Sequence, residues 1–421
     1  MSSPKSSELT INWTRSIWID TVIDEDLVKR LTPKILLLRQ ESDEPITVGI
    51  DSPGGSLSSL DTLLGLLTGP SQTASSGRIV TVATNKAYSA AANFLAFGTY
   101  SVAYRHAQVL YHDVRWGGME DVTPEKARNA AKSLQDANDA FSLRLANRII
   151  KRLIWTYIDI SSEFENIQKK FPITHKKFKT IVSAFAQEKV EGGHSADVAS
   201  FATYIYAKLS SQNDYLIKNV MDRLARWINF TKLAETAPTY RNKGSRVGGL
   251  LDGAQHLHKL LKGSPEHFKS SEKDLKLLLS LLVAEISSIK GQKVNFMQAL
   301  EDSSREFSLL QSMNDSKHFK SATSLMLEHE DIFFGRKIKE ELKGKSEQEQ
   351  YVILSAAAPY AQLFWHFCVL ICRELFEGEH VLKPNDAQLL GLIDEVAGGG
   401  PIQSRREFRV AQEKKGDGIA L

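Results

Sequence analysis

Ile46-Thr47-Val48-Gly49-Ile50-Asp51-Ser52-Pro53-Gly54-Gly55-Ser56 begins as an apolar strand-like run and ends in a Pro-Gly-Gly turn. Further along, Lys86-Ala87-Tyr88-Ser89-Ala90-Ala91-Ala92 forms a small-residue turn with one serine, and it opens an apolar helix. Val109-Leu110-Tyr111-His112 then puts a histidine at the end of another strand. Backbone amides, a hydroxyl and an imidazole are the groups that acyl transfer requires. No other part of the sequence offers such a set.

The region around these motifs alternates between strand-like and helix-like apolar patterns. Expected strands cover residues 11–19, 46–50, 78–83 and 109–111, and expected helices cover 24–38, 58–67 and 90–97. This alternation predicts an α/β domain with a mainly parallel sheet. Sites in such sheets lie at the carboxyl ends of the strands. Because Gly54, Ser89 and His112 each follow a strand end, we expect them to meet in one crevice.

The pattern changes after Thr123. Residues 124–155 repeat apolar positions at helical spacing, and the chain then continues helix after helix to about residue 360. Near the end, residues 386–396 indicate a short helix, a glycine stop and a strand. We therefore divide the chain into a flexible tail (1–10), the first part of the core (11–155), a helical insertion domain (156–360), the last part of the core (361–400) and a charged tail (401–421).

Composition excludes several classes of protein. The net charge of +3 over 421 residues is too close to neutral to argue for nucleic-acid binding. The only cysteines, Cys368 and Cys372, are expected to be buried thiols rather than a disulfide framework, which fits a reducing, cytoplasmic location. The polar residues 1–9 do not form a signal peptide. Residues 351–372 are long enough to cross a bilayer, but Pro359 and the polar groups among them favour a buried core helix.

The sequence also predicts no metal or cofactor site. His256 and His258 are two positions apart in a helical run, where side chains diverge. The glycine-rich residues 244–253 lack a Walker lysine-serine pattern.

Taken together, the motifs resemble the ClpP family of serine peptidases, within the wider ClpP/crotonase fold. Asp51-Ser52-Pro53-Gly54-Gly55-Ser56 is similar to the family's Asn-Ser-Pro-Gly-Gly-Ser turn, and Ala87-Tyr88-Ser89-Ala90-Ala91 is similar to its nucleophile turn. Leu110-Tyr111-His112 is similar to its Met-Ile-His strand end, and residues 387–396 resemble its Glu-Ala-x-x-Tyr-Gly-Leu-Val-Asp segment. The implied fold is a ClpP/crotonase-like parallel-sheet core interrupted by a large all-α insertion.

The resemblance implies roles for particular residues. Ser89 corresponds to the nucleophile and His112 to its base. The oxyanion hole would use backbone amides of Gly54 or Gly55 and of Ala90. The family's spacing, counted back from Gly391, places Glu379 where a triad aspartate is usual. Glu377 and Glu374 are close enough to take that place instead.

The implied activity is hydrolysis of peptide bonds in peptides or proteins through an acyl-enzyme, without a cofactor. The family also implies a homo-oligomer and an unfoldase or regulatory partner, but no nucleic acid and no membrane. Two alternatives stay open: a crotonase-like enzyme acting on an acyl-CoA, and an inactive scaffold whose helices bind partners.

Overall fold

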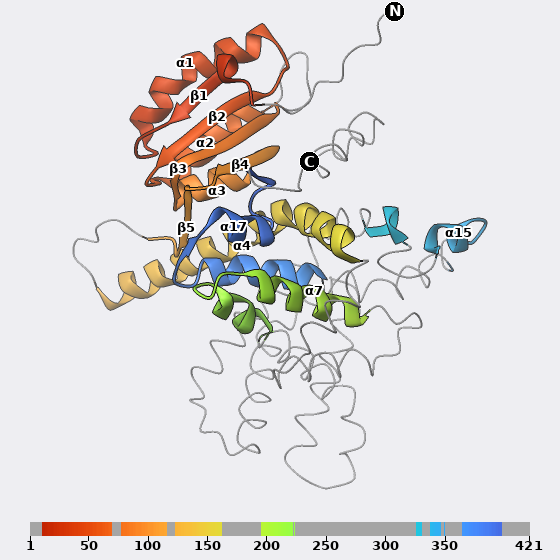
Figure 1. Ribbon diagram of the computed structural model, residues 1–421. Helices are drawn as coiled ribbons and strands as arrows, with labels where there is room; N and C mark the ends of the chain where they lie inside the picture. The colour runs from red at the N-terminus through yellow and green to blue at the C-terminus, as the bar shows by residue number, and fades with distance from the viewer. Residues whose placement is uncertain are drawn as a thin grey trace, which may run out of the picture.

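The computed structural model describes residues 11–69, 77–115, 123–161, 195–221, 223, 326–330, 337–346, 349 and 364–397. These residues form a mixed α/β structure around a mostly parallel sheet (Figure 1). The predicted fold class, a ClpP-like α/β core, is confirmed. Most of the predicted insertion domain, including His256, His258 and residues 244–253, lies outside the described residues.

The first half of the core alternates strand and helix as the sequence predicts. The elements are β1 (Ser16–Ile19), α1 (Glu25–Glu41), β2 (Ile46–Ser52), α2 (Leu57–Thr68), β3 (Ile79–Tyr88) and α3 (Ala90–Ala96). Local chemistry sets the helix boundaries. Asp24 caps α1 by accepting from the Leu27 amide, and Ser56 caps α2 by accepting from the Ser59 amide. A 3-10 turn, Trp13–Arg15, occupies part of the predicted first strand.

The sheet branches at β3, which is ten residues long. Its first half pairs with β4 (Tyr100–Tyr104) and its second half with β5 (Gln108–His112), both in parallel. Near the chain's end, β6 (Glu379–Leu382) pairs antiparallel with β5, and β7 (Glu395–Ala397) pairs parallel with β4. The sequence analysis did not identify β4 and β6. Both are short, and pairing with longer strands, rather than a strong local pattern, defines them.

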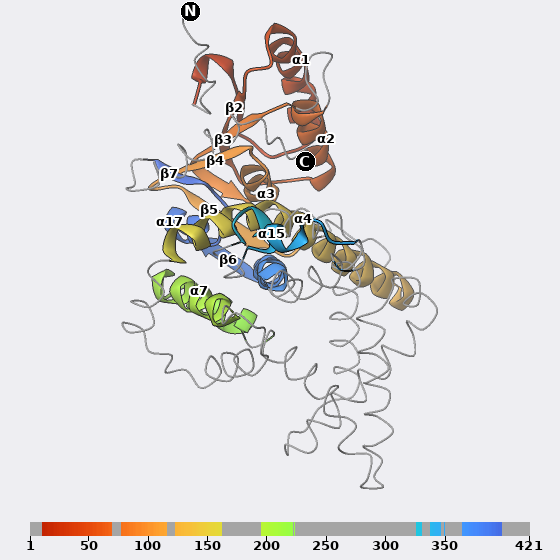
Figure 2. The same ribbon diagram turned by 90° about the vertical axis from the view of Figure 1, so that its right-hand side faces the viewer.

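Helices α1, α2 and α3 lie on one face of the sheet (Figure 2). The main apolar core lies beneath them, built from one side of each strand and the buried faces of the helices. A smaller apolar cluster lies on the opposite side of the sheet and contains Val80, Val82, Tyr100 and Val102. Because side chains alternate along a strand, successive β3 residues contribute to the two clusters in turn.

Helices after residue 123 complete the core. Helix α4 (Pro124–Ser161) is longer than predicted, and residues 364–375 form a buried helix. Cys368 and Cys372 are free and buried in this helix, as predicted. In the predicted insertion, α7 (Ser195–Lys208), residues 214–221 and α15 (Ile338–Leu342) are helical. None of the helices described here has the length and apolarity needed to cross a bilayer.

One buried ion pair joins α4 to the last part of the core. Arg152 Nε donates to Asp394 Oδ2 at 3.0 Å, and the two residues are only 3% and 4% exposed. The guanidinium also donates to the carbonyl oxygens of Ala96, Gly98 and Leu392. Asp394 Oδ2 accepts in turn from the Ser101 amide at 2.8 Å. A side chain on α4 therefore ties the α3–β4 turn to the strand that enters the sheet last.

Removal of this guanidinium takes away the positive charge that pairs with the buried carboxylate of Asp394. We expect Arg152→Leu to lower the free energy of unfolding by about 3–5 kcal/mol in urea denaturation. The matched control is Arg30→Leu, because Arg30 forms an ion pair with Asp20 in which both side chains are about half exposed. That substitution should cost no more than about 1 kcal/mol. Equal losses in the two variants would contradict the role assigned to Arg152.

Candidate functional site

The turn after β2 approaches the turn after β3 without room for a side chain. A Cβ on Gly54 would lie 2.4 Å from the Tyr88 carbonyl oxygen and 2.7 Å from Ser89 Cβ. Gly54 and Gly55 both have positive φ, at 96° and 151°. The sequence at this point therefore needs glycine for close approach as well as for backbone freedom.

The amides of this turn differ in availability. Gly54 N donates to Ser52 Oγ at 3.1 Å and is buried. Gly54 O and Ser56 N bond with the backbone of Ile23, which fixes the turn. Gly55 is exposed, and within the described residues its amide donates to no other group. Gly55 thus lines the pocket with an N–H that has no partner among the described residues, whereas the Gly54 N–H already has one.

Ser89 occupies the corner between β3 and α3 in a conformation usually reserved for glycine. Its φ of 56° and ψ of −121° make it the only positive-φ residue other than glycine in the described parts of the chain. Main-chain hydrogen bonds hold this corner in its conformation. Ser89 N donates to Leu110 O at 2.8 Å, and Ser89 O accepts from the Ala92 and Asn93 amides. The hydroxyl does not cap α3. Strain of this kind is held only where the surroundings enforce it, and it is concentrated at functional sites.

His112 ends β5, the parallel neighbour of the second half of β3. Its Nδ1 lies 2.5 Å from the carbonyl oxygen of Asp113. A carbonyl oxygen only accepts, so Nδ1 carries the proton and Nε2 of the neutral ring holds the free lone pair. The ring is therefore in the tautomer that a base acting through Nε2 requires.

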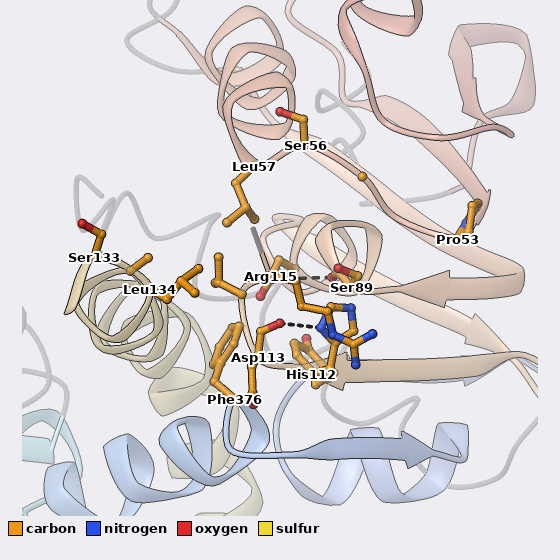
Figure 3. A pocket seen from close by; sticks show the side chains of 15 residues that line it. Pro53, Ser56, Leu57, Ser89, His112, Asp113, Arg115, Ser133, Leu134 and Phe376 are labelled. Atoms are coloured by element: carbon orange, nitrogen blue, oxygen red, sulfur yellow. Dashed lines mark hydrogen bonds between the residues drawn. The ribbon is translucent and has the colours of Figure 1, made fainter. Parts of the chain in front are cut away.

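Ser89 and His112 line one pocket of about 580 Å³. Figure 3 shows their side chains on one side of this pocket, with Leu57, Leu134 and Phe376 on the other. The full lining is Pro53, Gly55, Ser56, Leu57, Ser89, Asn93, Tyr111, His112, Asp113, Val114, Arg115, Ser133, Leu134, Ala137 and Phe376. A polar wall thus faces an apolar one, a combination that is typical of ligand-binding pockets.

Two other serines, Ser56 and Ser133, line this pocket, but neither lies at a strained corner between a strand and a helix. Ser56 caps α2 and shares a hydrogen bond with the Ser58 hydroxyl. Ser133 lies on α4, away from the strand ends. The two cysteines are no competing nucleophiles, because burial raises the pKa of both thiols well above its usual value.

Glu379 is brought beside His112 by strand pairing. The two residues are register partners in the antiparallel pair β5–β6, so their side chains emerge on the same face of the sheet. Side chains in such pairs have Cβ atoms about 4.5–5.5 Å apart. The Glu379 carboxylate itself accepts from Arg115 Nη2 at 3.2 Å. The other two carboxylates considered, Glu374 and Glu377, bind Asn219 and Arg223 instead.

Three residues of the site were not identified from the sequence. The Asp113 carbonyl accepts from the His112 ring, and its carboxylate accepts from Gly378 N at 2.8 Å. Arg115 pairs with Glu379, and Phe376 forms part of the apolar wall. Asp113 and Arg115 lie one and three residues after the predicted histidine, so their positions were a usable signal. Phe376 is far away in sequence and carried none.

Residues of the described structure suggest no metal centre. No group of three or more histidine, cysteine, aspartate or glutamate side chains in these parts of the chain could hold a metal ion.

The branched parallel sheet, with a strained serine corner beside a strand-end histidine, defines a ClpP-like α/β domain. Residues 6–149 match the sequence model of the family described as Clp protease. The match spans β1 to β5 and much of α4, so it includes Ser89 and His112 but not Glu379. No curated protein shows a significant match to the chain.

The strain at Ser89 yields a stability test. Ser89→Gly should relieve the positive φ, whereas Ser89→Ala keeps a Cβ and the same strain. We expect the glycine variant to be more stable than the alanine variant by about 1 kcal/mol in urea unfolding. A glycine variant less stable than the alanine variant would mean that this corner is unstrained.

Proposed function

We propose that this chain is a serine peptidase that hydrolyses peptide bonds in peptides or proteins through an acyl-enzyme. In this proposal Ser89 is the nucleophile, His112 the general base, and the amides of Gly55 and Ala90 form the oxyanion hole. The observation that carries it is the strained Ser89 corner, which lines the same pocket as a His112 whose Nε2 lone pair is free.

In the first step, His112 Nε2 takes the proton from Ser89 Oγ as this oxygen attacks the carbonyl carbon of the substrate. A serine hydroxyl is a weak nucleophile at neutral pH, so it needs such a base. The imidazolium then gives the proton to the leaving amine, and the acyl-enzyme forms. A water molecule activated by the same ring releases the acid product.

Two backbone amides are suited to hold the developing oxyanion. Ala90 is the first residue of α3, and its N–H therefore has no partner within the helix. Gly55 follows Gly54 in the turn that lies against Ser89, and its amide is the second proposed donor. One donor of this kind is typically worth about 3 kcal/mol of activation free energy. Gly54 serves this arrangement through its lack of a Cβ rather than through its own amide.

The imidazolium needs a partner at Nδ1. The Asp113 carbonyl accepts from this nitrogen, and Glu379 is the negative charge paired with His112 across the two strands. We propose that the Asp113 carbonyl fixes the tautomer of the His112 ring. Glu379 then stabilises the positive charge of the imidazolium. Arg115 competes for the same carboxylate, so Glu379 acts on His112 when it releases Arg115 or binds both.

The apolar wall of the pocket supports a substrate with an apolar side chain beside the cleaved bond. Leu57 and Val114 come from the core, and Leu134 and Ala137 from α4. Phe376 packs edge-on against Tyr111, which holds this wall in place. In line with the family, the proposal includes self-assembly and an unfoldase or regulatory partner that delivers substrate in the cytoplasm.

The activity is tested with short peptides that carry an apolar residue before a fluorogenic leaving group. Ser89→Ala and His112→Ala should each lower kcat by at least about a thousandfold, because the acyl-enzyme step is lost. A fluorophosphonate probe should label wild type at Ser89 and leave Ser89→Ala unmodified. Ser346→Ala, which removes an exposed hydroxyl outside the pocket, is the control and should keep full activity. A wild-type chain that resists the probe and cleaves nothing, in its assembled form, would disprove the proposal.

The split of roles at Nδ1 predicts a graded effect. Glu379→Gln should lower kcat about 10- to 100-fold, less than loss of His112, because the Asp113 carbonyl still orients the ring. Glu341→Gln on α15 is the control and should leave kcat unchanged. An unchanged kcat in Glu379→Gln would remove this carboxylate from the proposed site.

A further inference from the structure

We infer that residues 209–221 and 223, which lie outside the family match, position the active site, and that Tyr215 acts through His380 to keep Glu379 beside His112. The inference rests on the proposed function and adds a positioning residue to it. In Figures 1 and 2 the segment at 195–221 runs alongside the last part of the core, which carries β6.

The contact between Tyr215 and His380 is well defined. The Tyr215 hydroxyl lies 2.8 Å from His380 Nδ1, and the two rings stack with centroids 5.6 Å apart. His380 is only 2% exposed, and its Nε2 lies 3.2 Å from the carbonyl oxygen of Glu377. Since that carbonyl can only accept, Nε2 carries the proton and Nδ1 of the neutral ring accepts from the Tyr215 hydroxyl. Both nitrogens of this buried ring are satisfied, one of them by Tyr215.

His380 is the strand neighbour of Glu379, and the two side chains point to opposite faces of the sheet. His380 pairs with the buried Tyr111, and Glu379 pairs with His112. A one-residue shift or a rotation of β6 would exchange these faces. When Tyr215 fixes His380 on the buried face, it therefore fixes Glu379 on the face of His112.

Charged and polar contacts hold the two ends of β6 to the same segment. Arg223 binds the Glu377 carboxylate through both guanidinium nitrogens, and Asn219 Nδ2 donates to Glu374 Oε1 at 2.5 Å. Burial raises the pKa of Glu374 and the Asn219 hydrogen bond opposes that rise. Arg373 Nε also lies 3.2 Å from Glu377 Oε1 and 3.8 Å from Asp139 Oδ1. The carboxylates of Glu374 and Glu377 thus anchor the chain just before β6.

At the other end of β6, residues 210 and 213 bind the chain that follows the strand. Asn213 Nδ2 donates to Val381 O at 3.2 Å and to Asp386 Oδ2 at 2.8 Å. Ser210 donates to Asp386 through both its amide and its hydroxyl. β6 therefore has β5 on one edge, and residues 210–223 contact it before, within and after its four residues.

The test compares Tyr215→Phe with Tyr104→Phe, which removes a hydroxyl from β4 near the small apolar cluster on the other side of the sheet. Tyr215→Phe keeps the ring stack and loses only the hydrogen bond, so the fold should survive. We expect kcat to fall about fivefold to tenfold with KM unchanged. The double variant Tyr215→Phe/Glu379→Gln should be within about twofold of Glu379→Gln alone, because both changes remove one interaction.

A readout without catalysis separates this inference from the proposed function. In the Ser89→Ala background, Tyr215→Phe should speed hydrogen exchange of the β6 amides about fivefold, and Tyr104→Phe should not. Faster exchange supports the coupling even if the wild-type chain proves to cleave nothing, which would sink the proposed function alone. Equal exchange in the two variants, or full additivity of Tyr215→Phe with Glu379→Gln in an active enzyme, overturns the inference.

Discussion

The buried charge of Arg152 is the constraint on which the assembly of the core depends. Its guanidinium is surrounded by carbonyl oxygens from the α3–β4 turn and from the segment before β7, and its counter-charge is Asp394. A buried guanidinium is tolerated only where every donor finds an acceptor. Chain segments that are far apart in the sequence must therefore meet at this one point, which closes the sheet with β7 and sets where α4 lies.

A second constraint acts between backbones. The turn at Gly54 lies against the corner at Ser89, where a Cβ would meet both the Tyr88 carbonyl and the Ser89 side chain. The backbone of Ser89 is in turn bonded to Leu110 in β5, the strand that carries His112. The strained corner is thus held from two sides by main-chain contacts, which explains how the fold maintains a costly φ at a serine. The proposed nucleophile, base and oxyanion donors share this framework.

The short strand β6 connects that framework to the helical residues beyond it. It has β5 and the proposed base on one edge, and residues 210–223 bind the chain on both sides of it. In the proposed arrangement, the position of Glu379 therefore depends on residues outside the family match.

The sequence alone predicted most of the first half of the core. Regular alternation of apolar runs indicated β1 to β3 and their helices, because strand and helix patterns are local properties of the chain. The Pro-Gly-Gly turn, the serine turn and the strand-end histidine were found in order, since each carries its signal within a few residues. Only the tertiary structure revealed β4 and β6, the pairing of Arg152 with Asp394, and the partners of Glu379. Apart from the pairing of β4 with β3, these features depend on contacts between residues more than 200 positions apart, and such contacts are decided by burial, register and charge rather than by local pattern.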